Sequence, residues 1–471
     1  MVKISEVKKH IMNILIWGLI VFFAFLYVSL IFNYNIWTDE AFTLQLIQGD
    51  LKEISIGTAE DVQPPLYYYY CKLFFDITNE SLWVQKFITI IPQVGTYALI
   101  ATVFRKKFGD TATFLSLIFF TCIPCTMEFT VQVRMYSLAL FFVTLCGVFA
   151  YEAYVDNTKR AWVWLAVGAL GAAYTHYFAF VSIIVIVGFL FLAIVFTKRE
   201  LLKLWFISAT CMILGYLPWT KFFVYQVTRV RESYWIPEIT PEVIWDYFKW
   251  TFDLTLVPGV VYGVLAVLII AGIVLIASIV RRKEREDIVA LLAMLVPTVT
   301  AVLGIIISLS KSPIYRDQYV FPSLMLLALF FGIALRKVDW KWLIPICAFF
   351  LFVGAVQYKE CFRQEYRSTY VPQTMEFFEE NLAPDDYIVY NWEEFGFIYR
   401  QYFPADQLVY LGDFDFEQDF NNVWFLNSQW FDQVDQAELR ENGLTMDIIG
   451  RYGLEHNEFD LYMIYRNEYM E

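Results

Sequence analysis

Apolar runs of about 20 residues recur through the first 356 residues of the chain, and polar segments separate them. A helix that crosses the hydrocarbon core of a bilayer needs about 20 apolar residues, within a range of about 17–25. The pattern therefore predicts a polytopic α-helical membrane protein with about 11 transmembrane helices. The predicted spans cover residues 11–32, 87–104, 111–127, 136–155, 161–175, 177–196, 204–220, 256–280, 288–309, 318–335 and 341–356.

The composition supports this class of protein. Hydrophobic residues make up 59% of the chain and charged residues 18%, against about 45–50% and about 25% in soluble domains. So large an apolar share excludes a disordered chain. Seven Cys, an odd number placed mostly in apolar runs, exclude a disulfide scaffold. Three His leave little room for a His-rich metal site, and the net charge of −13 argues against nucleic acid, which needs a basic face.

Two apolar segments need a separate interpretation. The run 11–32 is too long for a signal-peptide core and lacks a small-residue cleavage site, which predicts a retained anchor. Residues 161–196 would be about 54 Å long as one helix, too long for one crossing. Because basic residues flank both ends of this segment, we expect a hairpin with both ends in the cytoplasm and its tip, at 175–177, outside.

Basic clusters fix the expected orientation in the membrane. Every second connection between spans is short, and these connections together hold 18 Lys and Arg, whereas the longer opposite connections hold 10. Cytoplasmic connections carry the excess of Lys and Arg. The sequence thus predicts a multi-pass protein with a cytoplasmic N-terminus and its C-terminal region outside the cytoplasm.

A change in charge near residue 357 marks a domain boundary. Residues 1–356 hold 28 Lys and Arg against 24 Asp and Glu, a net charge of +4, whereas residues 357–471 hold 7 against 24, a net charge of −17. We expect a membrane domain over 1–356 and a small acidic α/β domain over 357–471. In the latter the pattern predicts helices at 372–382, 393–403 and 434–442, strands at 387–392 and 459–465, and short apolar runs at 408–411 and 423–426.

Two long connections on the predicted outer side, residues 33–86 and 221–255, interleave polar residues with Trp, Tyr and Phe. This composition suits helices that lie in the membrane interface. The polar and charged residues that could bind a ligand or react lie in these and other outer connections, whereas the spans themselves are nearly free of charge.

The first candidate group is Trp37-Thr38-Asp39-Glu40, directly after the first span. Adjacent carboxylates at a membrane surface can bind a metal or accept a proton. A plainer interpretation is ordinary helix-start chemistry, with Thr38 as the N-cap and both acids in the first turn.

The second group reads Gln-Pro-Pro-Leu-Tyr-Tyr-Tyr-Tyr over residues 63–70, with Tyr67 as its substrate-site candidate. The prolines set a helix start. The tyrosines equally suit a plain membrane anchor in the aromatic belt.

The third group lies between residues 128 and 136. Glu128 and Gln132 are four residues apart and would share a helix face. Arg134 is a candidate phosphate ligand, because its planar guanidinium matches phosphate oxygens. The alternative is an Arg that snorkels from the end of a span.

The fourth group is the segment 311–319, where Lys311 and Arg316 are cations on the side at which basic residues are less expected. Arg316 has an alternative role as partner of its neighbour Asp317. His176, at the predicted hairpin tip, is either a ligand or an interfacial aromatic residue.

Taken together, these groups resemble the GT-C membrane glycosyltransferases. The motifs are Trp-x-Asp-Glu at 37–40, Pro-Pro-Leu-Tyr-Tyr at 64–68, Arg-Met-Tyr at 134–136, Thr-His-Tyr at 175–177 and Tyr-Arg at 315–316. Their order and shared side are similar to the bacterial branch that includes relatives of protein mannosyltransferases and the lipid A aminoarabinose transferase (glycosyltransferase family 39 and its relatives). The resemblance covers residues 11–356 and also fits members that carry an external C-terminal domain.

The resemblance implies an inverting transfer of a sugar from a polyprenyl-phosphate carrier to a glycan, lipid or protein acceptor at the outer face of a bacterial plasma membrane. It implies that Asp39 is the general base and that Glu40 helps to position or coordinate. Related enzymes often read Gln-Glu-Ala-Arg-Met-Tyr where residues 131–136 here read Val-Gln-Val-Arg-Met-Tyr. Position 132, where those enzymes carry an acid, is therefore occupied by Gln132. This puts a divalent cation such as Mg²⁺ or Mn²⁺ in doubt, with Asp39 and Glu128 as its candidate ligands.

The expected chemistry needs few ionisable groups. A phosphate leaves without being protonated, whereas glycosidases need a second carboxyl group for their leaving alkoxide. One base, Asp39, would take the proton of the acceptor. The cations Arg134, Arg316 and Lys311 would stabilise the departing phosphate, and the apolar, aromatic spans would line a groove for the lipid tail among membrane lipids.

Two other classes of protein stay open. A transporter or flippase for a lipid-linked sugar would place polar residues within its spans, and these spans hold few. A catalytically inactive relative that binds the lipid carrier is the second alternative, and Gln132 is the residue that favours it.

Overall fold

The computed structural model describes residues 2–32, 35–78, 80–232, 236–282, 284–310, 312–364, 370–429 and 431–466. The chain forms two compact units. The first comprises Met1–Phe32 and Leu51–Phe362, and the second comprises Asn33–Asp50 and Arg363–Glu471. The second unit is therefore discontinuous in sequence, because it contains a short segment that follows the first predicted span.

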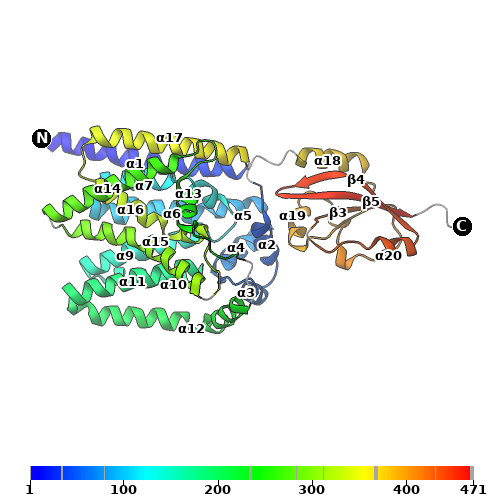
Figure 1. Cartoon of the computed structure of the whole chain (residues 1–471), viewed down its shortest axis with the longest axis horizontal. Helices are drawn as coiled ribbons and strands as arrows, with labels where there is room; N and C mark the ends of the chain where they lie inside the picture. The colour runs from blue at the N-terminus through cyan, green and yellow to red at the C-terminus, as the bar shows by residue number, and fades with distance from the viewer. Residues whose placement is uncertain are drawn as a thin grey trace. The chain divides into compact units, whose positions relative to one another are not determined.

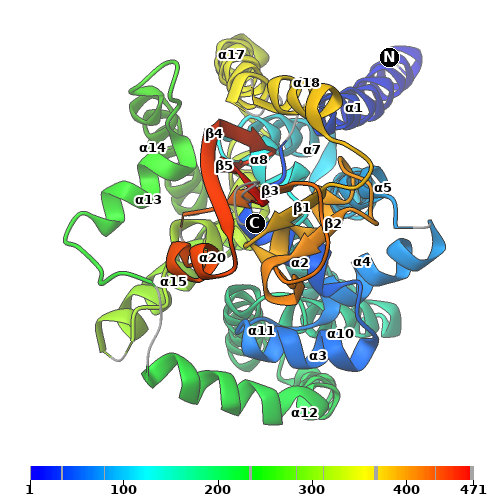
Figure 2. The ribbon, with the colours of Figure 1, turned by 90° about the vertical axis from the view of Figure 1, so that its right-hand side faces the viewer.

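The first unit is a helical bundle whose long helices run side by side (Figure 1). Figure 2 shows the same helices end-on. The elements of this unit are α1 (Val2–Ile31), α3 (Leu51–Glu60), α4 (Leu66–Ile77), α5 (Leu82–Ile88), α6 (Ile90–Leu99), η1 (Ile100–Phe104), α7 (Arg105–Thr121), α8 (Thr126–Val131), α9 (Tyr136–Asp156), α10 (Lys159–Ala173), α11 (Tyr177–Thr197), η2 (Arg199–Leu201), α12 (Leu202–Glu232), α13 (Val243–Phe252), α14 (Val260–Arg282), α15 (Arg285–Ser310), η3 (Asp317–Ser323), α16 (Leu324–Leu335) and α17 (Trp340–Gln364).

Within the described residues, nine stretches are long and apolar enough to cross a membrane. One of them, Leu82–Thr121, is 40 residues long and contains the predicted span 87–104 and most of the predicted span 111–127. Non-helical backbone at Gly109, with φ at 85°, interrupts it between those two spans. A further predicted span corresponds to α10, which has 15 residues and is shorter than a full crossing requires. These two features account for the difference from the expected number of about 11 helices.

The stretch 161–196 forms two helices, α10 and α11, joined by a break at residues 174–176. The predicted break within this segment is therefore confirmed. Helix α10 packs closely on α9. A Cβ placed on Gly168 would lie 2.6 Å from the backbone nitrogen of Cys146, so the two helix backbones approach closely enough to exclude any larger side chain.

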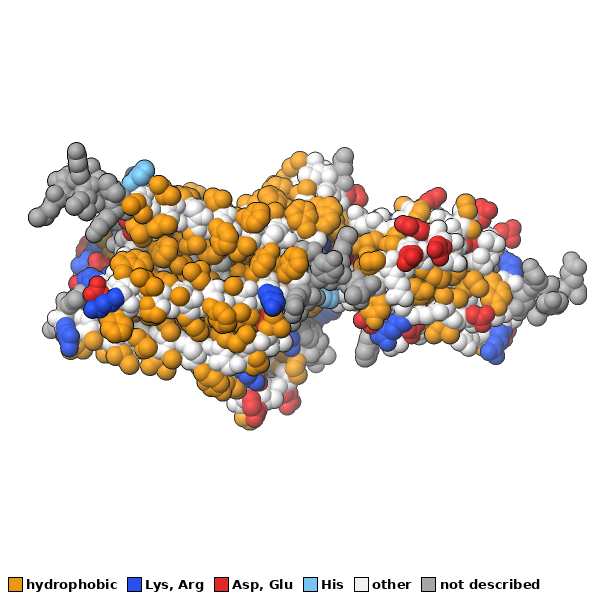
Figure 3. Space-filling view, turned by 90° about the horizontal axis from the view of Figure 1, so that it is seen from above, with side chains coloured by type: hydrophobic (Ala, Val, Ile, Leu, Met, Phe, Trp, Pro, Cys, Tyr) orange, Lys and Arg blue, Asp and Glu red, His pale blue; other side chains and the backbone are white. Residues whose placement is uncertain are grey.

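The outer surface of the helical bundle is apolar. Large hydrophobic side chains stand exposed on several helices, among them Phe196 on α11, Val280 on α14 and Leu309 on α15. The space-filling view shows hydrophobic side chains over most of the visible face of the bundle (Figure 3). A soluble protein rarely exposes an apolar patch of this extent, so the surface fits a protein surrounded by lipid.

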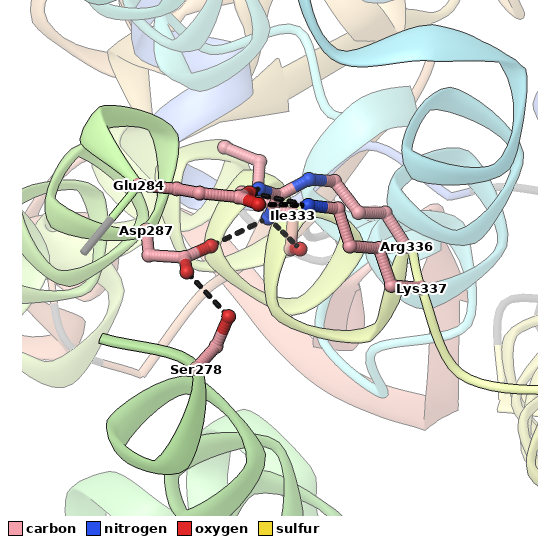
Figure 4. A network of polar contacts seen from close by, with 6 residues as sticks. All are labelled: Ser278, Glu284, Asp287, Ile333, Arg336 and Lys337. Atoms are coloured by element: carbon pink, nitrogen blue, oxygen red, sulfur yellow. Dashed lines mark hydrogen bonds and ion pairs between the residues drawn. The ribbon is translucent and has the colours of Figure 1, made fainter. Parts of the chain in front are cut away.

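An ion-pair network ties three helices together at one end of the bundle (Figure 4). Arg336, directly after α16, donates from Nη1 to Asp287 Oδ1 at 2.8 Å and from Nη2 to Glu284 Oε2 at 2.9 Å. Ser278 of α14 donates to Asp287 Oδ2 at 2.5 Å, and Lys337 also pairs with Glu284. The carboxyl group of Asp287, in the first turn of α15, is buried.

The second unit is built on a five-stranded mixed sheet in the order β2-β1-β3-β5-β4. Strand β1 pairs in parallel with β2 and β3, whereas β5 pairs antiparallel with β3 and β4. The elements are α2 (Thr38–Leu46), α18 (Tyr370–Asn381), β1 (Tyr387–Tyr390), η4 (Glu393–Phe395), α19 (Gly396–Tyr399), β2 (Leu408–Tyr410), η5 (Leu411–Asp413), β3 (Val423–Asn427), α20 (Gln436–Glu441), β4 (Leu444–Leu454) and β5 (Asn457–Arg466).

Both faces of the sheet are buried: Val389, Phe425 and Ile464 pack with Leu444 on one face, and Ile388 and Leu426 are buried on the other. The small α/β domain expected from the sequence is therefore present. Strand β4 was not predicted, because a bulge between Ile448 and Gly450 breaks the alternation on which a strand prediction depends.

Candidate active site

The acidic segment 35–46 belongs to the second unit. Its helix α2 has Trp37, not Thr38, as N-cap, and the backbone N–H of Trp37 donates to Glu40 Oε2 at 3.2 Å. The side chain of Glu40 is fully buried, whereas Asp39 is half-buried. Helix-start chemistry therefore explains Glu40, and it leaves Asp39 as the acid of this pair that reaches the surface of the unit.

A second group of candidates comes together in the first unit, around Arg134. This residue lies in the turn between α8 and α9 and is 5% exposed. Its Nη1 donates to the hydroxyl of Tyr68 at 3.5 Å, and that hydroxyl donates to Asp61 Oδ2, also at 3.5 Å. The arginine of the third motif therefore contacts the tyrosine run of the second.

His176 lies beside this group as the N-cap of α11. Its Nδ1 accepts the backbone N–H of Phe178 at 3.2 Å. Burial, and then the positive charge of Arg134, lower the pKa of the imidazole from 6.5 to about 3. The ring is therefore neutral at pH 7. Because Nδ1 accepts, its proton resides on Nε2, which becomes a hydrogen-bond donor.

Aromatic contacts join His176 to two further motifs. Its ring lies 5.9 Å from that of Tyr136 and 5.1 Å, edge to face, from that of Tyr319. The backbone of the hairpin tip is also bonded to the second motif, since the N–H of Leu66 donates to the carbonyl of Tyr174 at 2.9 Å. Motifs that are far apart in sequence thus converge on the hairpin tip.

The other residues predicted from the sequence of this unit have different surroundings. Tyr67 is buried and packs edge to face on Tyr68. Gln132, also buried, donates to Glu128 Oε1 at 3.3 Å, so the two side chains meet as their spacing predicts. Arg316 is half-buried and precedes η3. Lys311 lies outside the described residues.

A cavity of about 370 Å³ opens beside His176. Its polar lining residues include Gln63, His176, Gln226 and Tyr319, and aromatic and aliphatic side chains of α11, α12 and α15 supply most of the rest. Gln226 of α12 donates to the carbonyls of Thr58 at 3.0 Å and Gln63 at 3.2 Å and so closes one wall. The cavity is an apolar space with a polar end.

A larger cavity, of about 450 Å³, is formed by other segments, including residues 103–108, 147–154 and 285–296. None of the residues proposed from the sequence lines it. The smaller cavity is therefore the one that belongs to the candidate site.

Sequence reasoning did not select Asp61, Gln226 or Tyr319 as site residues. Tyr319 stands in the fourth motif, but its pattern does not distinguish it from an interfacial tyrosine. Gln226 falls beyond the predicted span 204–220, because α12 continues to Glu232. Its contact with Thr58 joins residues 168 positions apart, and no local pattern contains this information.

The described part of the chain contains no group of three or more His, Cys, Asp or Glu side chains placed to hold a metal ion. Glu128 is the acid nearest in sequence to Gln132, and its contact with that amide uses one of its oxygens.

The bundle of membrane-length helices, combined with a small sheet domain, has the fold of the GT-C class of membrane proteins. The structure resembles ArnT from Cupriavidus metallidurans bound to undecaprenyl phosphate, with a TM-score of 0.65 at 10% identity, over 96% of this chain and 97% of that chain. For apo ArnT from the same organism the TM-score is 0.57 at 10% identity, over 98% of both chains.

Two further comparisons complete this description. The sequence model described as dolichyl-phosphate-mannose-protein mannosyltransferase matches residues 62–220, which hold the second and third motifs and His176. The Archaeoglobus fulgidus oligosaccharyltransferase in complex with Zn and sulfate has a TM-score of 0.44 at 13% identity, over 83% of this chain and 62% of that one. No curated protein sequence matches the chain.

Proposed function

We propose that this protein is an inverting glycosyltransferase that moves a sugar from a polyprenyl-phosphate carrier to an acceptor in the cell envelope. The reaction would take place at the outer face of a bacterial plasma membrane. The acceptor would be a lipid, a glycan or a protein.

The observation that carries this proposal is a buried guanidinium close to a histidine that lines an apolar cavity. Arg134 is 5% exposed, and His176, whose pKa is lowered by burial and then by the charge of Arg134, lines the cavity of about 370 Å³. A polyprenyl phosphate has the matching chemistry, an anionic head on a long apolar tail. Arg binds phosphate through two parallel N–H donors, and the neutral His176 adds a donor at Nε2. The same head and tail occur in the undecaprenyl phosphate bound to ArnT.

Asp39 is the general base in this proposal. Inversion needs one base to take the proton of the attacking hydroxyl, whereas the departing phosphate needs charge stabilisation and no proton. Arg134 supplies this stabilisation with Arg316 and Lys311. Tyr67, Glu128 and Gln132 shape the site that receives the sugar and the acceptor, and Glu40 holds the start of the helix that carries Asp39.

A radiolabelled transfer assay tests the proposal. The full chain is given a panel of polyprenyl-phosphate sugars and envelope acceptors, alongside Asp39→Asn and, as a matched control, Asp76→Asn. Asp76 is a half-exposed acid on α4 that pairs with Lys72. We expect transfer by the wild type and the control and its loss in Asp39→Asn. A chelator arm decides between metal-independent transfer and a requirement for Mg²⁺ or Mn²⁺.

Other results would favour one of the two rivals. Donor binding without transfer from any sugar in the panel would identify a catalytically inactive carrier-binding relative, the class that Gln132 favours. Movement of the lipid-linked sugar across vesicles, unchanged in Asp39→Asn, would identify a flippase.

A further inference from the structure

The turn between β4 and β5 has an unusual backbone. Glu455 is the first residue of this turn and has φ at 55°, in the left-handed region that residues other than Gly rarely adopt. Its side chain is nevertheless 3% exposed. A carboxylate in a surface turn normally points to water, so a buried one in a strained turn indicates a specific use.

The carboxylate of Glu455 holds the acidic segment through its backbone. The N–H of Ile36 donates to Glu455 Oε2 at 2.8 Å, and the N–H of His456 donates to the carbonyl of Ile36 at 3.1 Å. The hydroxyl of Tyr402 donates to the other oxygen of Glu455. Both backbone polar groups of Ile36, three residues before Asp39, are therefore bonded to one turn.

The place of this turn in the sheet strengthens the argument. Strands β1, β2 and β3 are parallel, and β5 runs antiparallel to β3 with Asn427 opposite Asp460. The start of β5, and the turn before it, therefore lie at the carboxyl ends of the parallel strands. Open α/β sheets bind their ligands at this edge.

In this unit the carboxyl edge of the sheet holds part of the chain itself. Helix α2 packs on η4 and α19, which directly follow β1. The same edge thus receives Ile36 at the β4–β5 turn and α2 at the end of β1. The segment with Asp39 takes the position at which such a domain would otherwise hold a small ligand.

We propose that Glu455 is a positioning residue that fixes the Asp39 segment on the sheet domain, so that the domain presents the general base to the reaction. This inference rests on the proposed function. Glu455 contacts neither donor nor acceptor and acts through Asp39 alone. The C-terminal domain is accordingly part of the catalytic machinery, as the holder of its base.

Two substitutions separate charge from hydrogen bonding. Glu455→Ala removes both acceptor oxygens. Glu455→Gln keeps one oxygen for the N–H of Ile36, and its amide N–H can donate to the Tyr402 hydroxyl, which is able to accept. Glu458→Ala is the matched control, because Glu458 lies three residues further on and makes an exposed pair with Arg451.

The test is transfer kinetics on the full chain in lipid nanodiscs. We expect Glu455→Ala to lower kcat by about tenfold or more with the donor KM within about twofold, since the hydrogen-bond acceptor of the Ile36 N–H is lost. Glu455→Gln should stay within about threefold of the wild type, and Glu458→Ala should be unchanged. Equal losses in the Ala and Gln variants, or no loss in either, would overturn the inference.

Hydrogen exchange makes the test independent of activity. In Glu455→Ala, amides of residues 36–46 should exchange about tenfold faster or more, with those of β1 and β3 unaffected. Unchanged exchange over 36–46 contradicts the inference even if no transfer is ever found. If the wild type transfers no sugar while exchange responds as expected, the proposed function has failed and the docking of the segment has not.

Discussion

The guanidinium of Arg134 donates to the hydroxyl of Tyr68 at 3.5 Å, although 66 residues separate them in the chain. Tyr68 belongs to the connection that follows the first span, and Arg134 belongs to the turn before α9. Because His176 also lies near enough for the charge of Arg134 to lower its pKa, one cation organises three segments of the candidate site.

Replacement of Arg134 should weaken binding of the lipid carrier. We expect Arg134→Gln to reduce the affinity for undecaprenyl phosphate by about 1.5–3 kcal/mol, the usual contribution of a hydrogen bond to a charged group. Native mass spectrometry or a fluorescent polyprenyl phosphate measures this affinity. The control is Arg160→Gln, whose guanidinium lies over the ring of Phe149. Equal affinities in both variants and the wild type would remove Arg134 from the donor site.

The neutral state of His176 should make stability depend on pH. Its pKa is depressed to about 3 in the folded protein, against about 6.5 when unfolded. The unfolded chain therefore binds more protons between these values, and the free energy of unfolding falls as the pH drops below about 6.5. At pH 5.5 the loss from this residue amounts to about 1.4 kcal/mol. Thermal unfolding at pH 7.5 and 5.5 should show a smaller decrease in His176→Gln than in the wild type, and an equal decrease would contradict this origin.

The network around Arg336 should contribute strongly to stability. Arg336→Leu leaves the buried carboxylate of Asp287 without its cation, and such a loss costs about 3–5 kcal/mol. The matched control is Lys341→Ala. Lys341 pairs with Asp339 at 3.9 Å, and both side chains are well exposed. We therefore expect this substitution to lower the free energy of unfolding by less than about 1 kcal/mol. Unfolding midpoints in detergent compare the two variants, and similar midpoints would show that the network adds little.

The contact between α9 and α10 should tolerate no side chain at Gly168. An added Cβ would lie 2.6 Å from the backbone nitrogen of Cys146, and a backbone shift of this kind costs about 1–3 kcal/mol. At Gly188 of α11, nothing lies within 4 Å of such a Cβ, so Gly188→Ala should be neutral or stabilise the helix by up to about 1 kcal/mol. The difference in unfolding midpoint between Gly168→Ala and Gly188→Ala measures the effect. A smaller loss at Gly168 than at Gly188 is incompatible with close packing there.

Local sequence patterns predicted most of the fold. The lengths of the apolar runs predicted the membrane helices, and the length of the segment 161–196 predicted the break before α11. Charge asymmetry marked the acidic domain, and the alternation at 459–465 predicted its strand β5. Strand β4 was not predicted, because its bulge at Ile448 interrupts the two-residue alternation of side chains.

The candidate site was harder to predict, since its contacts are long-range. Periodicity cannot show that Gln226 reaches Thr58 or that Ile36 binds Glu455, 419 residues further on. The motifs named Asp39 and Arg134 one at a time. The structure assigns Asp39 to the sheet unit and Arg134 to the helical unit, a division that no local pattern contains.

The bond between Ile36 and Glu455 also sets an order of events during biosynthesis. A ribosome adds about 5–20 residues per second, so the 419 residues between these partners take about 20–80 s to synthesise. Throughout this interval the helices of the first unit are made while the partner of residues 35–46 does not yet exist. Asp39 can reach its final setting in the sheet unit only after the last strands emerge, so under the proposed function the base would come into place only after the membrane helices have been made.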